Sequence, residues 1–442
     1  MRRPAPAFAL MLAVAGCNPF VDAEQARICR TAIPPLNHEG AELRITRTTR
    51  GPLPGSIRVD YTVGAATQRT SRIVVCTFAA EGLDQQKSVI TGIATERGPL
   101  PDASFYFLRR FYLNAPGEPP ADPGAAELGT DAPRLPAELA YGLQQAVAAL
   151  PAMAIYGLLA ASYALIFGLV GRVNLAFGAF AAVGGSAATM TILGMLTIGV
   201  VAPMPGLLAG LVGAVFAAAL YGAVIARFAI WPIRNATSQA ALIASVGVYL
   251  ALSEYLRLTQ GSTGRWIPPV ANTPLPVARA GDFVVTTTPM ALAVVAIGLA
   301  AAAVIVVTLK FTRFGRAWRA YADDPKAAAL FGIDARSLLD RTFVMACGAA
   351  GIAGFIMVAH YGGLGFASGF TLGLKALVAA VLGGVGSVPG AFLGGILIAL
   401  AEALWSAALP IEGRDVAIFG LIALLMLFRP TGLLGFEPPM WR

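Results

Sequence analysis

The chain has 442 residues, of which 57% are hydrophobic and 13% charged, and its mean hydropathy is +0.70. Soluble domains carry about a quarter charged residues, so the composition excludes an ordinary soluble protein and indicates a bilayer-embedded chain. The net charge of +8 arises almost entirely after residue 140, since residues 1–140 hold 15 basic against 14 acidic residues and residues 141–442 hold 17 against 10. These later basic residues cluster between long uncharged stretches, which indicates membrane topology and not a nucleic-acid partner.

The first 17 residues have the pattern of a processing signal. Two arginines precede a short apolar run over residues 7–15, well below the roughly 20 residues that a membrane-spanning helix needs. The run ends in Val14-Ala15-Gly16-Cys17, which resembles a bacterial lipobox, where the Cys receives lipid. We therefore expect a signal peptide over residues 1–17 with lipidation at Cys17. The alternative is a plain signal peptide in which Cys17 stands by chance.

Residues 18–135 are predicted to form a small, β-rich extracytoplasmic domain and a linker. Alternating apolar and polar residues at 42–45 and 57–61 indicate strands with one exposed face, and the run at 73–76 indicates a buried strand. Residues 104–113 fit either a strand or a helix, and residues 114–136 read as the linker. An oxidising periplasm makes Cys29 and Cys76 a disulfide candidate, and two free buried thiols are the alternative.

From about residue 140, long uncharged runs alternate with short charged segments. Each run should be a helix, because backbone groups in lipid must form hydrogen bonds within their own segment. The fold class is therefore mainly α: a polytopic transmembrane bundle of about seven to nine spans, including a broken or re-entrant segment. The expected spans are residues 145–170, 174–197, 206–226, 239–256, 289–309, 342–361 and 416–428.

Charge counting orients these spans. With the N-terminal domain outside, the cytosolic loops hold 12 basic residues and the periplasmic loops hold four, with Lys375 undecided, in agreement with the positive-inside rule. We expect a multi-pass protein of the bacterial inner membrane with a periplasmic N-terminal domain. Because the last span should run inward, residues 371–408 must begin and end outside, either as a re-entrant hairpin or as two short crossings.

The cytosolic loop at residues 310–341 encodes a short helix with its own start and stop. Asp324 suits the N-cap, Pro325 the first helical position and Gly332 the position after the helix. A helix of about two turns is unstable alone, so it should rest on a partner such as a separate ATPase. The alternative is a basic helix lying on anionic lipid. The residues expected to couple to an ATPase are Arg316, Arg319, Asp323, Asp324, Pro325, Ala328, Leu330, Phe331 and Gly332.

The chain itself has no ATP-binding motif. It contains four lysines, and none lies in a G-x-x-x-x-G-K-[ST] context. Its ionisable residues in the membrane region are sparse, so no catalytic constellation is expected. We therefore expect a non-catalytic subunit that holds no cofactor or metal of its own.

A glycine-rich break at residues 382–390 interrupts the predicted segment 371–408. Irregular backbone at membrane depth is tolerated only where it lines a cavity or is buried in protein. Lys375 and Glu402 flank this break and are charges that are costly near lipid unless paired or wet, so a bridge between them is one expectation, and snorkelling at helix ends is the alternative. For Asn174 the alternative to lining the path is helix capping, and for Ser245 it is a hydrogen bond to the backbone. The residues expected to form a translocation path or gate are Asn174, Ser245, Lys375, Gly383, Gly384, Gly386, Ser387, Pro389 and Gly390.

Four stretches resemble the permease subunits of branched-chain amino-acid ABC importers, over about residues 140–436. They are Gly171–Gly178, the Arg316–Asp334 loop, Lys375–Gly390 with its continuation to Glu402, and Arg429–Gly435. The first stretch has Phe177 where the family usually has His, which argues against a polar role at that position. The N-terminal 135 residues lie outside the usual family pattern.

The resemblance implies a permease domain at residues 140–436 that works by alternating access. It also implies two ABC ATPase subunits that bind ATP-Mg, a second permease subunit, a periplasmic solute-binding protein and surrounding membrane lipid as partners. Urea and short-amide permeases are similar in sequence, so they provide an alternative solute class. A channel or carrier that works without an ATPase is a further alternative.

Overall fold

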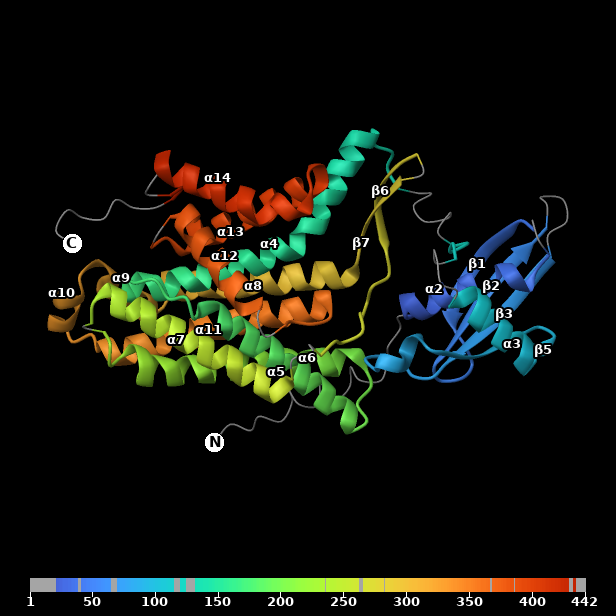
Figure 1. The fold of residues 1–442 in the computed structure, drawn as a ribbon, viewed down its shortest axis with the longest axis horizontal. Coiled ribbons are helices and arrows are strands. Elements are labelled where there is room, and N and C mark those ends of the chain that lie inside the picture. The colour runs from blue at the N-terminus through green and yellow to red at the C-terminus, as the bar shows by residue number, and fades with distance from the viewer. Residues whose placement is uncertain are drawn as a thin grey trace. The chain divides into compact units, whose positions relative to one another are not determined.

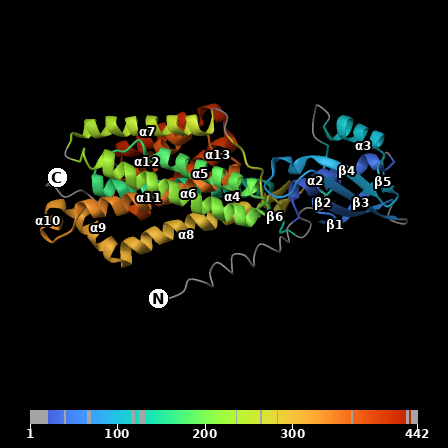
Figure 2. The same cartoon turned by 90° about the horizontal axis from the view of Figure 1, so that it is seen from below.

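The computed structural model describes residues 21–38, 41–64, 70–114, 120–124, 132–234, 236–261, 265–281, 283–365, 368–384, 386–428 and 432–434 (Figures 1 and 2). Contacts divide the chain into two compact units. The first, here called the sheet unit, contains residues 1–141 together with 195–206 and 268–290. The second, the helical unit, contains the remaining residues to 442. The predicted signal peptide, with Cys17, lies outside the described residues.

The sheet unit is built on five antiparallel strands that pair in chain order (Figure 1). Alternation along the second strand buries Ile57, Val59 and Tyr61, so one face of the sheet forms the core. The helix α2 packs on this core and begins at the N-cap Asp22, whose side chain accepts hydrogen bonds from the N–H groups of Glu24 and Gln25. The elements are α2 (Ala23–Thr31), β1 (Leu43–Arg50), β2 (Ser56–Val63), β3 (Thr70–Phe78), β4 (Ile90–Thr95) and β5 (Gly98–Pro99).

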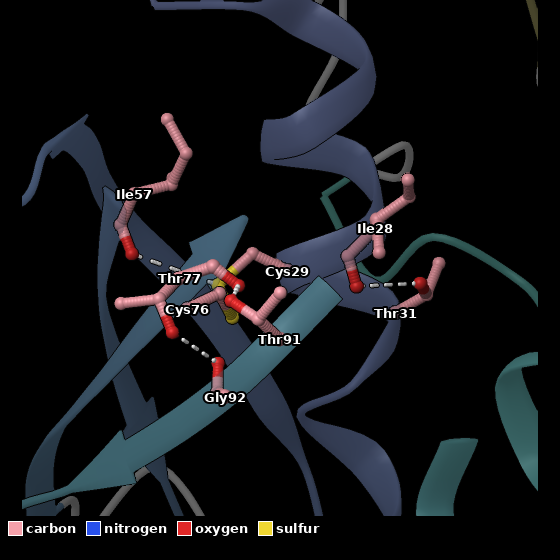
Figure 3. The surroundings of a disulfide bond; sticks show 8 residues. All are labelled: Ile28, Cys29, Thr31, Ile57, Cys76, Thr77, Thr91 and Gly92. Atoms are coloured by element: carbon pink, nitrogen blue, oxygen red, sulfur yellow. Dashed lines mark hydrogen bonds between the residues drawn. A yellow bond between two sulfur atoms is a disulfide. The ribbon is translucent and has the colours of Figure 1, made fainter. Parts of the chain in front are cut away.

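A disulfide joins α2 to the centre of the sheet (Figure 3). It links Cys29 of α2 to Cys76 of β3, with Cα atoms 5.8 Å apart, and both residues are fully buried. In the sheet, Cys76 lies between Ile57 of β2 and Ile93 of β4, so the bridge crosses the middle of the apolar core. The other cysteine that the structure describes, Cys347, is free and buried in the helical unit.

Reduction of this disulfide should destabilise the sheet unit strongly. The bridge closes a loop of 47 residues, and the chain-entropy model assigns a loop of that length about 4 kcal/mol of stabilisation. Limited proteolysis of the full-length protein should therefore cut the N-terminal region faster in dithiothreitol than without it. A Cys29→Ala/Cys76→Ala variant is the control, since its cleavage rate should be high and indifferent to reductant. Equal cleavage of the wild type in both conditions would contradict the prediction.

Two parts of the sheet unit are not determined by the sequence pattern: one is compatible with both strand and helix, and one is not predicted at all. Residues 104–113, which fit either a strand or a helix, are helical: α3 (Asp102–Leu108) continues into a π-helical turn (Arg109–Leu113). A two-stranded hairpin, β6 (Leu275–Ala280) with β7 (Phe283–Thr287), was not predicted. Lys87, in the turn between β3 and β4, ties the segment just before this hairpin to the start of α2. Its side chain is 1% exposed, pairs with Asp22 at 2.8 Å and donates to the Pro269 carbonyl.

The helical unit confirms the predicted polytopic architecture. Seven of the described helices are long and apolar enough to cross a membrane, and α12 and α14 are shorter, with 16 and 15 residues. The first six predicted spans coincide with α4 to α8 and α11. The helices are α4 (Ala137–Val170), α5 (Phe177–Thr197), α6 (Pro203–Ile225), α7 (Ser238–Gln260), α8 (Pro289–Phe311), α9 (Arg313–Asp323), α10 (Pro325–Leu330), α11 (Ala335–Tyr361), α12 (Ser368–Gly383), α13 (Val388–Ala408) and α14 (Arg414–Phe428).

Glycines bring several of these helices into backbone contact. A Cβ on Gly354 of α11 would overlap the carbonyl of Ala181 in α5, and a Cβ on Gly395 of α13 would overlap the backbone of Gly157 in α4. Small residues that permit such close approach are typical of helix packing in membranes, where lipid is as apolar as the side chains. The glycine-rich composition therefore serves the packing of α4, α5, α11 and α13.

The segment 371–408 is a hairpin of two helices, α12 and α13, joined by the predicted glycine break. Gly384 and Gly386 have φ angles of +114° and +89°, a conformation that favours glycine. The side chain of Ser387 then caps α13 by accepting from the N–H of Gly390 at 3.2 Å.

Candidate functional site

The predicted coupling helix is present as α10, and its start and stop follow the sequence signals. The Asp324 carboxylate accepts hydrogen bonds from the N–H groups of Lys326 and Ala327, at 2.8 and 3.1 Å. At the other end, Gly332 has a φ of +82°, and the N–H groups of Gly332 and Ile333 donate to carbonyls of the last turn. This is a Schellman motif, which ends a helix at a glycine. Local hydrogen bonds therefore fix both the start and the end of α10.

The C-terminal end of α10 presents two large apolar side chains to the outside of the chain. Leu330 is 89% exposed and Phe331 is 88% exposed, and α10 lies at one end of the bundle of long helices (Figures 1 and 2). Adjacent apolar side chains exposed to this extent mark a surface that contacts either a protein partner or the membrane. We refer to Leu330 and Phe331 together as the apolar corner.

Other predicted coupling residues have different positions. Ala328 is 3% exposed, so it packs inside this chain and is not available to a partner. Arg316, Asp323 and Asp324 are exposed, whereas Arg319, also exposed, donates to the carbonyl of Leu309 at the end of α8. Pro325 is exposed and opens α10.

A residue that sequence reasoning missed, Trp318, attaches the coupling segment to the bundle. Its ring is buried, and its indole N–H donates to the carbonyl of Leu165 in α4 at 3.2 Å. The ring lies against Gly168, where a Cβ would overlap it. A tryptophan among basic residues is the available signal, but its partner lies 153 positions away and cannot be read from local pattern. The contact links α9 to α4.

A cavity of about 230 Å³ lies beside the coupling segment within the helical unit. Tyr321 and Pro325 of the coupling segment line it, together with Leu339 and Phe343 of α11. Its polar lining residues are Arg172, Asn174, Arg234 and Ser245. The structure therefore brings the predicted path residues Asn174 and Ser245 to the same cavity as the predicted coupling residue Pro325.

Asn174 and Ser245 line this cavity, and their side chains also form hydrogen bonds with backbone groups. The Asn174 side-chain oxygen accepts from the N–H of Ala176 at 3.0 Å, and its own N–H donates to the Tyr163 hydroxyl at 3.1 Å. The Ser245 hydroxyl donates to the Leu242 carbonyl at 2.7 Å and accepts from the N–H of Leu175 at 3.1 Å. These bonds fix the turn before α5 against α7. Tyr163 is a further site residue that the sequence did not reveal.

Lys375 lies in a buried ion-pair network that joins four helices. Its ammonium is 2.5 Å from Glu402 Oε1 in α13 and 3.5 Å from Asp415 Oδ1 in α14. The Tyr156 hydroxyl of α4 donates to Glu402 Oε2 at 3.0 Å and accepts from Lys375 at 3.4 Å. Lys375 and Glu402 are each 7% exposed, so neither snorkels freely to the surface of this chain.

The glycine break belongs to a close backbone contact. Gly383 and Gly390 approach each other so closely that a Cβ on either would overlap the carbonyl of the other. The carbonyls of Leu382 and Gly383, at the end of α12, accept from the N–H groups of Leu433 and Leu434 at 2.9 Å. None of the break residues Gly383, Gly384, Gly386, Ser387, Pro389 and Gly390 lines the cavity described above.

Known proteins match this chain mainly over the helical unit. Residues 145–429 match the family described as "Branched-chain amino acid transport system / permease component". The high-affinity branched-chain amino acid transport system permease protein LivH of Escherichia coli K12 is 36% identical over 295 residues, which cover 67% of this chain and 96% of LivH. The corresponding protein BraD of Pseudomonas aeruginosa is 34% identical over 308 residues, covering 67% and 97%.

A more distant similarity extends over part of the same region. The permease protein LivM of Escherichia coli K12 is 34% identical over 127 residues, which cover 28% of this chain and 29% of LivM. No solved structure matches the chain. The family match leaves residues 1–144 uncovered, so the sheet unit is largely an addition to it. The chain belongs to the family of branched-chain amino acid transport permeases, and it is a non-catalytic membrane component of an ABC transport system.

Proposed function

We propose that this permease carries branched-chain aliphatic amino acids, or close relatives of them, inward across the bacterial inner membrane. The family match over residues 145–429 supports this substrate class. Coupling to an energy source is supported by one structural observation, the meeting of two features at one cavity. Asn174 and Ser245, in segments of the family match, line the same space as Tyr321 and Pro325 of the coupling segment. Movement of the coupling segment would therefore change the shape of a polar space inside the bundle.

ATP hydrolysis on a separate subunit is proposed to supply the energy. The apolar corner is exposed, whereas Trp318 in the same segment is buried and holds the segment on the bundle through its contact with α4. A force applied at the corner would pass through Trp318 to α4. The proposed assembly has ABC ATPase subunits that bind ATP-Mg, a second permease subunit, which the LivM similarity supports, a periplasmic solute-binding protein and surrounding lipid.

The N-terminal region is proposed to face the periplasm. A disulfide between Cys29 and Cys76 suits that oxidising compartment, and the positive-inside rule gives the same orientation. The proposed divisions are a signal peptide at residues 1–17, a periplasmic domain and linker at 18–135, and the permease domain at 140–436. Lipidation at Cys17 is part of this proposal, and mass spectrometry of the mature N-terminus tests it.

Solute competition tests the proposed substrate class against the urea and short-amide alternative. The chain is produced with its partner ATPase and binding protein in cells that lack their own leucine and urea uptake systems. Labelled leucine should accumulate, and an excess of isoleucine or valine should suppress it while urea and acetamide should not. Uptake of urea without uptake of leucine would reject the proposed substrate and leave the family assignment intact.

A further inference from the structure

The ion pair between Lys375 and Glu402 is placed inside the bundle on the uptake side. Lys375 is seven residues from the start of α12, and Glu402 is six residues from the end of α13, so each lies about 10 Å in from that end at 1.5 Å per residue. The start of α12, the end of α13 and the start of α14 face the same side by helix order. In the proposed orientation, that side is the periplasmic one.

Stability alone is a weak reason for such a pair. Removing two charges from water costs several kcal/mol for each ion, and apolar residues often replace a buried pair without loss. Within the described residues, Glu402 Oε1 touches Lys375 but receives no well-aligned hydrogen bond, and neither does Asp415 Oδ1. Charged residues at membrane depth are functional candidates for this reason.

The network also extends from the surface to the buried pair. The Asp415 side chain is 49% exposed and lies 3.5 Å from both Lys375 and the Arg414 guanidinium. Lys375 in turn lies 5.4 Å from the centre of the Tyr156 ring, whose hydroxyl holds Glu402. A charged solute that approaches Asp415 therefore meets polar groups at each step toward Glu402.

We infer that Lys375 and Glu402 bind the carboxylate and the ammonium of the transported amino acid, respectively. This inference rests on the proposed function and deepens it. An α-amino acid carries one charge of each sign. It can therefore insert between Lys375 and Glu402 and give each side chain a new partner of opposite charge in the low-dielectric interior. Tyr156 is the positioning residue, because its hydroxyl fixes Glu402. Urea carries neither charge and would have to leave the pair closed, so the site selects zwitterions.

A double variant that removes both charges provides the test. Lys375→Met/Glu402→Gln keeps the approximate volumes, and loss of both partners of a buried pair is usually tolerated by the fold. Binding of labelled leucine to the purified assembly, measured in detergent without the soluble binding protein, should fall about 30-fold or more, as for loss of desolvated charge pairs at interfaces. Thermal stability and the elution volume of the purified assembly should stay at wild-type levels, which shows that the variant is folded. Glu254→Gln, in the exposed pair with Arg257, is the matched control and should bind leucine normally.

A second measurement uses the wild-type assembly and so avoids any effect on folding. Leucinamide lacks the carboxylate and 4-methylpentanoate lacks the ammonium, so neither should displace leucine at a 30-fold excess, roughly the factor expected for one lost charge pair. Wild-type leucine binding by the double variant, or displacement by either analogue as effective as leucine itself, would overturn the inference. Failure of the wild type to bind or transport leucine at all would instead reject the proposed function.

Discussion

Replacing both residues of the apolar corner, in Leu330→Asp/Phe331→Asp, is expected to abolish association with the ATPase and with it solute uptake. Two side chains at 89% and 88% exposure make few contacts within this chain, so their loss should leave its fold unchanged. Buried apolar anchors at interfaces are worth about 2 kcal/mol or more each, and aspartate adds an unpaired charge. Co-purification of the ATPase with the tagged chain measures the association.

The control for this variant is an equally exposed apolar residue elsewhere. Ile198 is 72% exposed in the turn between α5 and α6, so Ile198→Asp should leave ATPase association intact. Ala328→Asp is a poor probe of the same contact because Ala328 is buried, and it should lower thermal stability first. Normal ATPase association by the double variant would show that the corner is not the docking surface, and would favour a helix that lies on lipid.

The second large effect is expected at Gly354, where helices α5 and α11 touch. A methyl group there would overlap the Ala181 carbonyl and come within 2.7 Å of the Gly185 nitrogen, and backbone cannot move aside as a side chain can. Gly354→Ala must therefore push the two helices apart, at a cost of about 3 kcal/mol. The purified protein in detergent should lose its sharp elution profile at a clearly lower temperature than the wild type.

Gly348, six residues earlier in the same helix, gives a matched comparison. A Cβ at that position would lie 3.6 Å from Val215 Cγ1 and 3.7 Å from Ala219 Cβ, which is ordinary contact distance. Gly348→Ala should therefore be neutral or slightly stabilising, because alanine favours helix by up to about 1 kcal/mol. Equal thermal stability of the two variants would mean that backbone contact at Gly354 does not hold the bundle together.

Features encoded by neighbouring residues were predictable from the sequence. The start and stop of α10 follow from Asp324, Pro325 and Gly332, because caps act over three or four positions. The membrane spans follow from long apolar runs, because the hydropathy of a span is a property of consecutive residues. The hairpin β6–β7 was missed because Val284 and Val285 continue directly toward the apolar run of α8, and hydropathy alone does not separate a strand from the helix after it.

Contacts between distant segments could not be read from the sequence. Ala328 and Leu330 are two positions apart on one short helix, yet one is 3% and the other 89% exposed, because burial depends on which face of the helix packs against the rest of the chain. How the helices pair decides which groups Trp318 and Asn174 contact. It also decides that Asp415 approaches Lys375. A charge within a long apolar run did mark Lys375 and Glu402 as candidates, because an isolated charge in lipid needs a partner.

Leucine uptake into proteoliposomes, measured with and without the ATPase subunits, tests the central claim most directly. The chain is reconstituted with its second permease subunit and binding protein, and ATP is supplied on the ATPase side. The account predicts uptake against a gradient only when ATP and a hydrolysis-competent ATPase are present, and none when the ATPase carries a disabled phosphate-binding lysine. Concentrative uptake in liposomes without any ATPase would contradict it.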